Sequence, residues 1–204
     1  VWLADVDEAA ALQAVARECL AQWGVPDVVI ANAGISLGVD SAQAPDLPVF
    51  AQVLRTNVLG VLHTFHPFLA PMRERGAGRL VAIASVAGIR GLPGHGAYCA
   101  SKAGVIAYAE SLRGELRGSG VGVSTLVPGY VATPLTARNR YPMPFLMQPE
   151  AFAERAWRAI DAGVSYRVIP WPMGVVAKLM RLLPNALFDR LLQGRPRKHR
   201  HTEH

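Results

Sequence analysis

Four short segments built almost wholly from apolar residues alternate with longer segments of helical spacing, and this alternation limits the fold of the 204-residue chain more than any other feature. Strands that are apolar on both sides are typical of a parallel sheet covered by helices on both faces. The sequence therefore predicts an α/β fold with a doubly wound parallel sheet. The four segments are DVVIAN from Asp27, RLVAIAS from Arg79, VGVSTLV from Val121 and YRVIP from Tyr166.

Helices are expected between these strands. Asp7 is a candidate N-cap for the first helix, with Gly24 as its end. Pro67 and Pro71 should bend or divide a later one, because proline removes a backbone donor. The expected ranges are 8–23, 47–75, 96–117 and a helix that begins at Pro149.

Two other stretches carry expectations. The opening VWLADV has the pattern of a further strand that leads into a helix, which suggests that sequence upstream is missing. The Pro-rich loop 129–148 is longer than most connections in a compact domain, so it is a candidate lid or substrate wall. A mobile surface loop is the alternative for 129–148.

The composition indicates one globular domain, with 51% apolar and 18% charged residues. We expect a catalytic domain over 1–172, an amphipathic helical extension over 173–194 and a basic tail over 195–204. Half of the net charge of +6 comes from that tail, and the body without it is nearly balanced. The basic pI therefore does not predict nucleic-acid binding.

No metal site or membrane span is expected. Cys19 and Cys99 fit no metal-binding spacing and favour a reducing cytoplasm. His63 and His66 lie three residues apart but lack a carboxylate or Cys partner. The longest uncharged run, 118–137, is interrupted by prolines and glycines and so cannot form a spanning helix.

Tyr98 and Lys102 stand one helical turn apart in a chain that has 18 Arg but only three Lys. Chance alone predicts about 0.07 Tyr-x-x-x-Lys pairs at this composition. A cation close to a phenol favours the phenolate and lowers the pKa of the tyrosine, so that it can act as both acid and base. The pair therefore indicates a catalytic site.

Small and polar residues follow the predicted strands. In a doubly wound sheet, ligands bind beyond the carboxyl ends of the strands, where small residues allow the backbone to approach closely. Taken singly, each of these residues is explained as part of a turn. They are Asp5, Asn32, Ala33, Gly34, Ser85, Pro128 and Gly129.

Together with Asn57, Tyr98 and Lys102, these residues match a known pattern: ANAG at 31–34, NVLG at 57–60, Ser85, YCASK at 98–102 and PGYVATP at 128–134. The sequence resembles the classical short-chain dehydrogenase/reductase family over residues 1 to about 170. The resemblance implies a Rossmann-like fold, NAD or NADP as cofactor, and hydride transfer between the nicotinamide and a carbonyl or alcohol carbon. It also implies a homo-oligomer.

The resemblance assigns four catalytic residues. Tyr98 is the acid/base, Lys102 tunes it and holds the cofactor ribose, and Ser85 positions the substrate oxygen. Asn57 is expected to hold a water in a proton relay to Lys102, although a core Asn satisfied by backbone groups is the alternative.

The resemblance also implies cofactor contacts. Asp5 and Val6 correspond to contacts with the adenine ring and Thr133 to contacts with the nicotinamide amide, although Asp5 and Thr133 could simply be caps. His95 is a further candidate for the substrate pocket. The expected cofactor-binding set is Asp5, Val6, Asn32, Ala33, Gly34, Tyr98, Lys102, Pro128, Gly129, Val131 and Thr133.

The Gly-rich turn that brings backbone N–H groups to a pyrophosphate is not found in this sequence. The fold is therefore expected to be N-terminally incomplete as given, and the residues that choose between the cofactors are absent with that turn; NADP is slightly preferred. The favoured interpretation is part of a complete oxidoreductase. The alternative is an inactive remnant that binds a partner through an exposed sheet edge.

The C-terminal segment shows apolar stripes that are interrupted at Pro184 and followed by basic residues. Such helices bind anionic lipid surfaces or cover a hydrophobic channel, so we expect either a peripheral membrane contact or a cover over a hydrophobic substrate. Packing against the body or a sister subunit remains equally open. The stripes are formed by Leu179, Leu182, Leu183, Leu187 and Leu191.

Overall fold

The computed structural model describes residues 1–137, 139, 141–194 and 200. Its centre is a sheet of four parallel strands in the order β1-β2-β3-β4. The predicted α/β class and the parallel sheet are confirmed. The strands are β1 (Val28–Ala31), β2 (Gly78–Ile83), β3 (Val121–Pro128) and β4 (Tyr166–Ile169).

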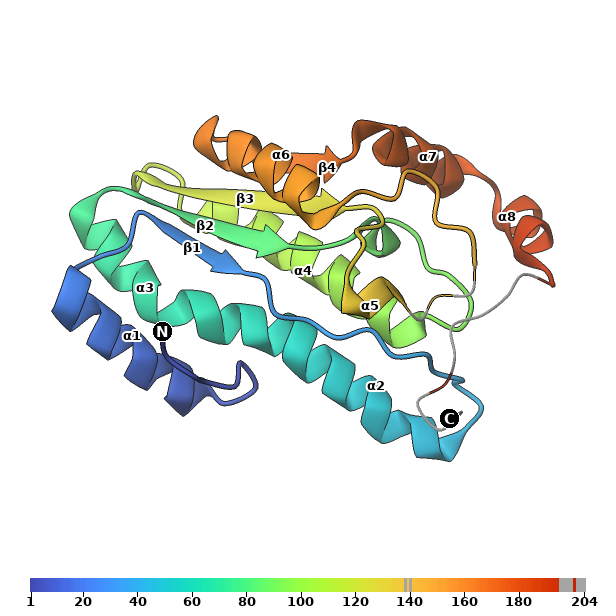
Figure 1. Ribbon diagram of the computed structural model, residues 1–204, viewed down its shortest axis with the longest axis horizontal. Coiled ribbons are helices and arrows are strands. Elements are labelled where there is room, and N and C mark those ends of the chain that lie inside the picture. Colours follow the sequence, from blue (N-terminus) through green and yellow to red (C-terminus); the bar gives the residue numbers. More distant parts are fainter. Residues whose placement is uncertain (138, 140, 195–199, 201–204) are drawn as a thin grey trace.

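Helices cover both faces of this sheet, as the apolar strands predicted (Figure 1). On one face α3 (Gly60–Arg75) and α4 (Gly96–Glu115) bury a core that includes Phe65 and Val105 against Leu80. On the other face α6 (Pro149–Asp161) packs Ile160 against Val81 and its neighbours.

The register of the strands brings their carboxyl ends to one edge of the sheet. Ala31 pairs with Ala82, Ile83 with Leu126, and Pro128 with Ile169. Because all strands run in the same direction, the residues that follow them converge there.

Helix α1 (Ala9–Trp23) packs against α3 and ends at Gly24, whose φ of 76° is favourable only for glycine. The predicted end is therefore confirmed. The predicted cap is wrong, because Glu8 occupies the N-cap position and makes no side-chain hydrogen bond there. The Asp7 carboxylate instead accepts a hydrogen bond of 3.1 Å from the Thr56 hydroxyl.

The predicted helix 47–75 is interrupted, but not at its prolines. Helix α2 (Leu47–Leu54) passes through a π turn, η2 (Arg55–Leu59), into α3, which contains both Pro67 and Pro71. Each proline removes only one backbone hydrogen bond, and buried side chains hold α3 on the sheet. The π turn contains Asn57, and such turns are frequent at functional sites.

Residues 1–5 form no strand, so the strand predicted for VWLADV is wrong. A strand needs a neighbour for its backbone hydrogen bonds, and no strand in the described part of the chain lies beside this segment. Trp2 packs edge-on against Trp23, with 4.9 Å between the ring centroids, and donates a hydrogen bond to Glu18.

The ends of the loop 129–148 are joined by contacts within the loop. The loop contains the short helix α5 (Pro134–Ala137), and the contacts that join its ends are hydrogen bonds from Ala132 N to Met147 O (2.9 Å) and from Met147 N to Tyr130 O (3.0 Å). The chain then continues beyond α6 and β4 into α7 (Trp171–Leu182) and α8 (Asn185–Leu192).

The two C-terminal helices lie at the periphery of the molecule (Figure 1). They meet at Pro184, where the apolar stripes were predicted to break. The predicted basic tail falls outside the described residues except for Arg200, which forms an ion pair of 2.9 Å with the buried Asp46. None of the described helices has both the length and the apolarity needed to span a membrane.

Candidate active site

Tyr98 and Lys102 lie on the first two turns of α4, on the same face of the helix, as their spacing predicted. The Lys102 ammonium is buried, with 4% of the residue exposed, and lies 5.9 Å from the centroid of the Tyr98 ring. It donates a hydrogen bond of 2.8 Å to the carbonyl of Ile83, the last residue of β2. The helix and the central sheet thus position this amine together.

Ser85 follows β2 and has two contacts. Its hydroxyl oxygen accepts a hydrogen bond of 3.2 Å from the backbone N–H of Ala87, which caps the 3₁₀ turn η3 (Val86–Gly88). The same side chain interacts with the Tyr98 side chain and acts to lower the pKa of that phenol. Ser85 is therefore both a turn-capping residue and a site residue, because the turn that it caps holds it beside the phenol.

The pKa values differ from the expectation that Lys102 lowers the pKa of Tyr98. Burial raises the pKa of Tyr98 above its ordinary value of 10.0, and the hydrogen bond with Ser85 only partly opposes this. Burial also lowers the pKa of Lys102 from 10.5 to about 8. The Lys102 amine donates its hydrogen bond to the Ile83 carbonyl. Because burial raises the pKa of Tyr98, the surroundings of the phenol favour its neutral, proton-carrying form.

Asn57 is fully buried behind the site, and its amide group is satisfied by protein atoms. Its Oδ1 accepts from Ile35 N (2.8 Å), and its Nδ2 donates to Ile35 O (2.9 Å) and to the Ser101 hydroxyl (2.9 Å). The Ser101 hydroxyl in turn donates to the carbonyl of Tyr98 at 2.8 Å. Asn57 therefore joins the loop after β1 to the start of α4, and its place in a proton relay stays a prediction.

Gly34 lies between these groups. A Cβ at this position would lie 3.1 Å from Asn57 Oδ1 and 3.4 Å from Lys102 Nζ. Any side chain here would therefore press on both residues, so the absence of a side chain keeps open the space in front of the amine.

A cavity of about 400 Å³ opens at the carboxyl edge of the sheet, and most of the predicted site residues line it. Asn57 lies behind its wall, and Ala33 does not line it. The predicted residues that line it are Asn32, Gly34, Ser85, Tyr98, Lys102, Pro128, Gly129, Val131 and Thr133.

Asp5 and Val6 also do not line this cavity. Asp5 accepts a hydrogen bond of 2.9 Å from the backbone N–H of Asp7 and so forms a local turn. The Val6 side chain packs close to Gly60, and the Val6 carbonyl lies 2.8 Å from His63 Nδ1. Their predicted contact with an adenine ring stays a prediction.

Sequence reasoning missed much of the rest of the cavity wall, because these residues belong to no motif. His95 was named in advance, and the loop containing Tyr130, Leu135, Thr136, Asn139 and Tyr141 was predicted as a wall without naming its members. A cover over a hydrophobic substrate was also one of the expectations for the C-terminal segment, which contains the lining residues Met173 and Met180. The further lining residues are Ser36, Ile83, Ala84, Val86, Ala87, Arg90, Leu92, Pro149, Phe152, Met173 and Met180.

Aromatic rings form one side of the cavity. The ring centroid of Tyr141 lies 5.7 Å from that of His95 and 6.3 Å from that of Tyr130. Burial, followed by the neighbouring Tyr130 and Tyr98, raises the pKa of Tyr141 to about 12. Tyr141 therefore stays neutral at physiological pH and does not compete with Tyr98 as a base.

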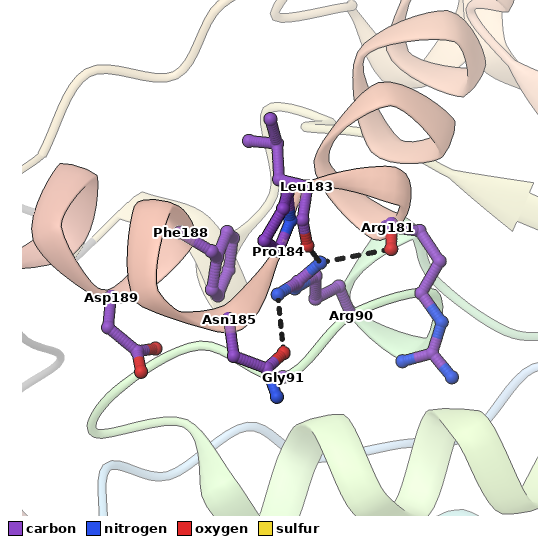
Figure 2. A pocket seen from close by; sticks show the side chains of 8 residues that line it. All are labelled: Arg90, Gly91, Arg181, Leu183, Pro184, Asn185, Phe188 and Asp189. Carbon is purple, nitrogen blue, oxygen red and sulfur yellow. Dashed lines mark hydrogen bonds between the residues drawn. The ribbon is translucent and has the colours of Figure 1, made fainter.

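Arg90 lines this cavity and also a second pocket, drawn in Figure 2, that is formed with residues of the C-terminal helices. Its Nη1 donates to the carbonyls of Met180, Arg181 (3.0 Å) and Leu183 (2.8 Å), at the end of α7. The guanidinium also donates to Asn185 Oδ1 (3.1 Å) and lies 3.9 Å from the centroid of the Phe188 ring, both on α8. One side chain thus holds both helices against the loop that follows η3.

The described residues contain no cluster of three or more His, Cys, Asp or Glu side chains that could hold a metal ion.

The arrangement matches a known family. A model described as short chain dehydrogenase matches residues 1–143. This chain belongs to the short-chain dehydrogenase family. The resemblance inferred from the motifs is therefore confirmed, and the enzyme class is oxidoreductase.

Two curated relatives support this assignment. An uncharacterized oxidoreductase of Myxococcus xanthus is 41% identical over 185 residues, which cover 91% of this chain and 73% of the relative. A ketoacyl reductase, HetN, of Nostoc is 36% identical over 160 residues, which cover 76% of this chain and 55% of the relative. This short-chain dehydrogenase thus spans about half to three quarters of the length of these relatives.

Solved structures agree on the fold. Serine dehydrogenase from Escherichia coli matches with a TM-score of 0.70 and 26% identity, covering 81% of this chain and 73% of that one. A gluconate 5-dehydrogenase from Burkholderia cenocepacia, in complex with NADP and tartrate, matches with a TM-score of 0.62 and 29% identity, covering 66% of this chain and 52% of that one. The Rossmann-like fold is confirmed by these neighbours.

Proposed function

We propose that the cavity is the active site of an NAD(P)-dependent dehydrogenase/reductase that interconverts a hydrophobic carbonyl compound and its alcohol. One observation carries this proposal: a phenol that interacts with a serine, one helical turn from a buried lysine, lies in the wall of a cavity of about 400 Å³. General acid–base catalysis on a carbonyl oxygen needs a positioned proton donor and a second donor beside it.

The residues fit a nicotinamide cofactor. The Lys102 ammonium has three donors, and Ile83 is the acceptor recorded for it among the described residues. Gly34 leaves open the space in front of this amine, which suits the approach of a ribose. When bound, the cofactor supplies or accepts the hydride. Lys102 and Asn32 would hold the ribose side, and Thr133 the nicotinamide amide.

The protein side chains move the proton. In the reductive direction the Tyr98 hydroxyl transfers its proton to the substrate oxygen as the carbonyl carbon gains the hydride, and in the oxidative direction the same oxygen takes the proton back. The Ser85 hydroxyl donates a hydrogen bond to that substrate oxygen and orients it. The positive charge of Lys102, which lies 5.9 Å from the centroid of the Tyr98 ring, would stabilise the phenolate formed during turnover, whereas in the structure burial dominates and raises the pKa of Tyr98.

The side chains of the cavity wall support an apolar substrate. The choice between NAD and NADP rests on one comparison with a solved structure. Leu92, Phe152, Met173 and Met180 are among the apolar side chains that line the cavity. NADP is favoured because a similar dehydrogenase was solved in complex with NADP. A homo-oligomer in the cytoplasm is the assembly and location that we expect.

The purified protein should oxidise NADPH in the presence of apolar ketones or aldehydes, followed by nicotinamide absorbance. Tyr98→Phe should lower kcat/KM by about 10²- to 10⁴-fold, the usual contribution of a general acid. Tyr166→Phe, on β4 and outside the cavity, is the matched control and should retain full activity.

Wild-type turnover by Tyr98→Phe would refute this mechanism. If the folded protein neither binds a nicotinamide cofactor nor turns over any carbonyl compound, the alternative of a partner-binding protein without activity would replace it.

A further inference from the structure

Helix α7 exposes a row of large apolar side chains. Trp171, Val175, Leu179 and Leu182 follow one another at intervals of four, four and three residues, which places them in one stripe along the helix. On α8, Leu187 and Leu191 repeat this spacing. These six residues, called the C-terminal ridge below, are 46% to 80% exposed. Exposed apolar side chains that gather in this way mark an interaction surface.

Basic residues flank the C-terminal ridge. Lys178 and Arg181 on α7 and Arg190 on α8 are exposed, whereas α7 contains no acidic residue and α8 contains only Asp189. In the sequence, Arg195, Arg197 and Lys198 follow directly. An apolar face with lysines and arginines at its border is typical of helices that lie in the plane of a lipid interface.

The opposite side of α7 contacts the candidate active site. Met173 and Met180 line the cavity, and Ala177 between them is buried. One helix thickness therefore separates the substrate cavity from the C-terminal ridge. Arg90 holds this helix pair in place through the carbonyls at the end of α7, as Figure 2 shows.

We propose that the C-terminal ridge docks this protein on the surface of an anionic lipid bilayer, with α7 between the bilayer and the substrate cavity. The six apolar side chains enter the headgroup region and the flanking cations contact the lipid phosphates. A second copy of the chain fits this face less well, because a symmetric contact would bring the same cationic borders together. The docking itself does not depend on the reaction proposed above.

Flotation with vesicles tests this directly. The full-length protein should float with vesicles of phosphatidylcholine and phosphatidylglycerol, and much less with phosphatidylcholine alone. Leu179→Gln combined with Leu182→Gln should lower the floating fraction on anionic vesicles by about tenfold, because both side chains lose their burial in the interface. Lys178→Gln with Arg190→Gln should weaken binding and reduce its dependence on salt.

The matched control is Leu3→Gln with Leu47→Gln, which alters two exposed leucines far from this face in the sequence. It should float like the wild type. Equal flotation of the ridge variant and this control would overturn the proposal, as would binding that ignores lipid charge.

Sedimentation in the absence of lipid tests the alternative occupant of the C-terminal ridge, which is a second copy of the chain. If Leu179→Gln with Leu182→Gln converts an oligomer into a monomer, the C-terminal ridge is a subunit interface and the lipid proposal fails. Unchanged sedimentation together with lost flotation supports it. Because flotation is measured without cofactor or substrate, its outcome is distinct from that of the turnover assay.

Discussion

At the scale of single residues, the site places a cation where the fold disfavours it. Lys102 is almost fully buried, and its pKa of about 8 records the cost of its charge there. Among the residues that the structure describes, neither Asp nor Glu lines the cavity with it. A residue kept at such a cost to stability is expected to serve the reaction rather than the fold.

Lys102→Met should therefore stabilise the protein while abolishing turnover. The folded-state pKa of about 8 lies below the ordinary 10.5, so the unfolded chain holds this proton more tightly. The stability contributed by this group rises with pH between these two values and is lowest below pH 8. After the loss of the hydrogen bond to Ile83, a net gain of about 2 kcal/mol is expected at pH 7.

Thermal melts measure this gain. At pH 7, Tm should rise by about 4 to 8 °C, and the difference should shrink as the pH approaches 10. Lys178→Met, on the exposed side of α7, is the control and should show no such trend. A Lys102→Met protein that is less stable than the wild type at pH 7 would show that the hydrogen bond of Lys102 outweighs the cost of burying its charge.

At the scale of elements, the structure shows a connection that the sequence does not reveal. Arg90 contacts residues 90 or more positions away along the chain, through backbone carbonyls that any sequence would provide. No motif marks such a contact. Asn57 differs, because a poor helix former inside a helical pattern already indicated a site, although the π turn around it was not foreseen.

Arg90→Ala should loosen α7 and α8 without altering the acid–base pair. Without Arg90, the carbonyls at the end of α7 lose their charged donor, so both helices should open more often. Exchange of the backbone amide hydrogens in 171–192 should therefore become at least about tenfold faster. KM for an apolar substrate should rise while the pH profile of kcat is unchanged. Arg158→Ala, which removes an exposed pair with Glu154 on α6, is the control. Unchanged exchange in 171–192 would contradict this role.

At the scale of the whole molecule, the sequence predicted the layers and the position of the site but not its boundary. Apolar strands such as RLVAIAS predicted a parallel sheet, and parallel strands bring Gly34, Ser85 and Gly129 to one edge by geometry alone. Single members of the far wall such as Phe152 could not be predicted, because they are apolar residues like those of any core; for the C-terminal segment that contains Met173, a cover over a hydrophobic substrate was one of the expectations. The strand predicted at VWLADV failed because a strand depends on a neighbour as well as on its own pattern.

Cofactor binding should be visible in the stability of the whole chain. A ligand at about 100 times its Kd stabilises the folded state by about 2.7 kcal/mol, so NADPH should raise Tm by several degrees and NADH by less. A thermal-shift titration with each nucleotide measures this. Equal shifts would remove the preference for NADP, and a larger shift with NADH would reverse it.

The match to the short-chain dehydrogenase model ends at residue 143, whereas Phe152, Met173 and Met180 come after it. The proposed catalytic side chains and these three apolar lining residues thus come from consecutive stretches of the chain. The residues after 143 can therefore be replaced while the catalytic residues before them are kept. A chimera that receives residues 144–194 from a relative should inherit the relative's substrate preference and keep the proton-transfer machinery of this chain.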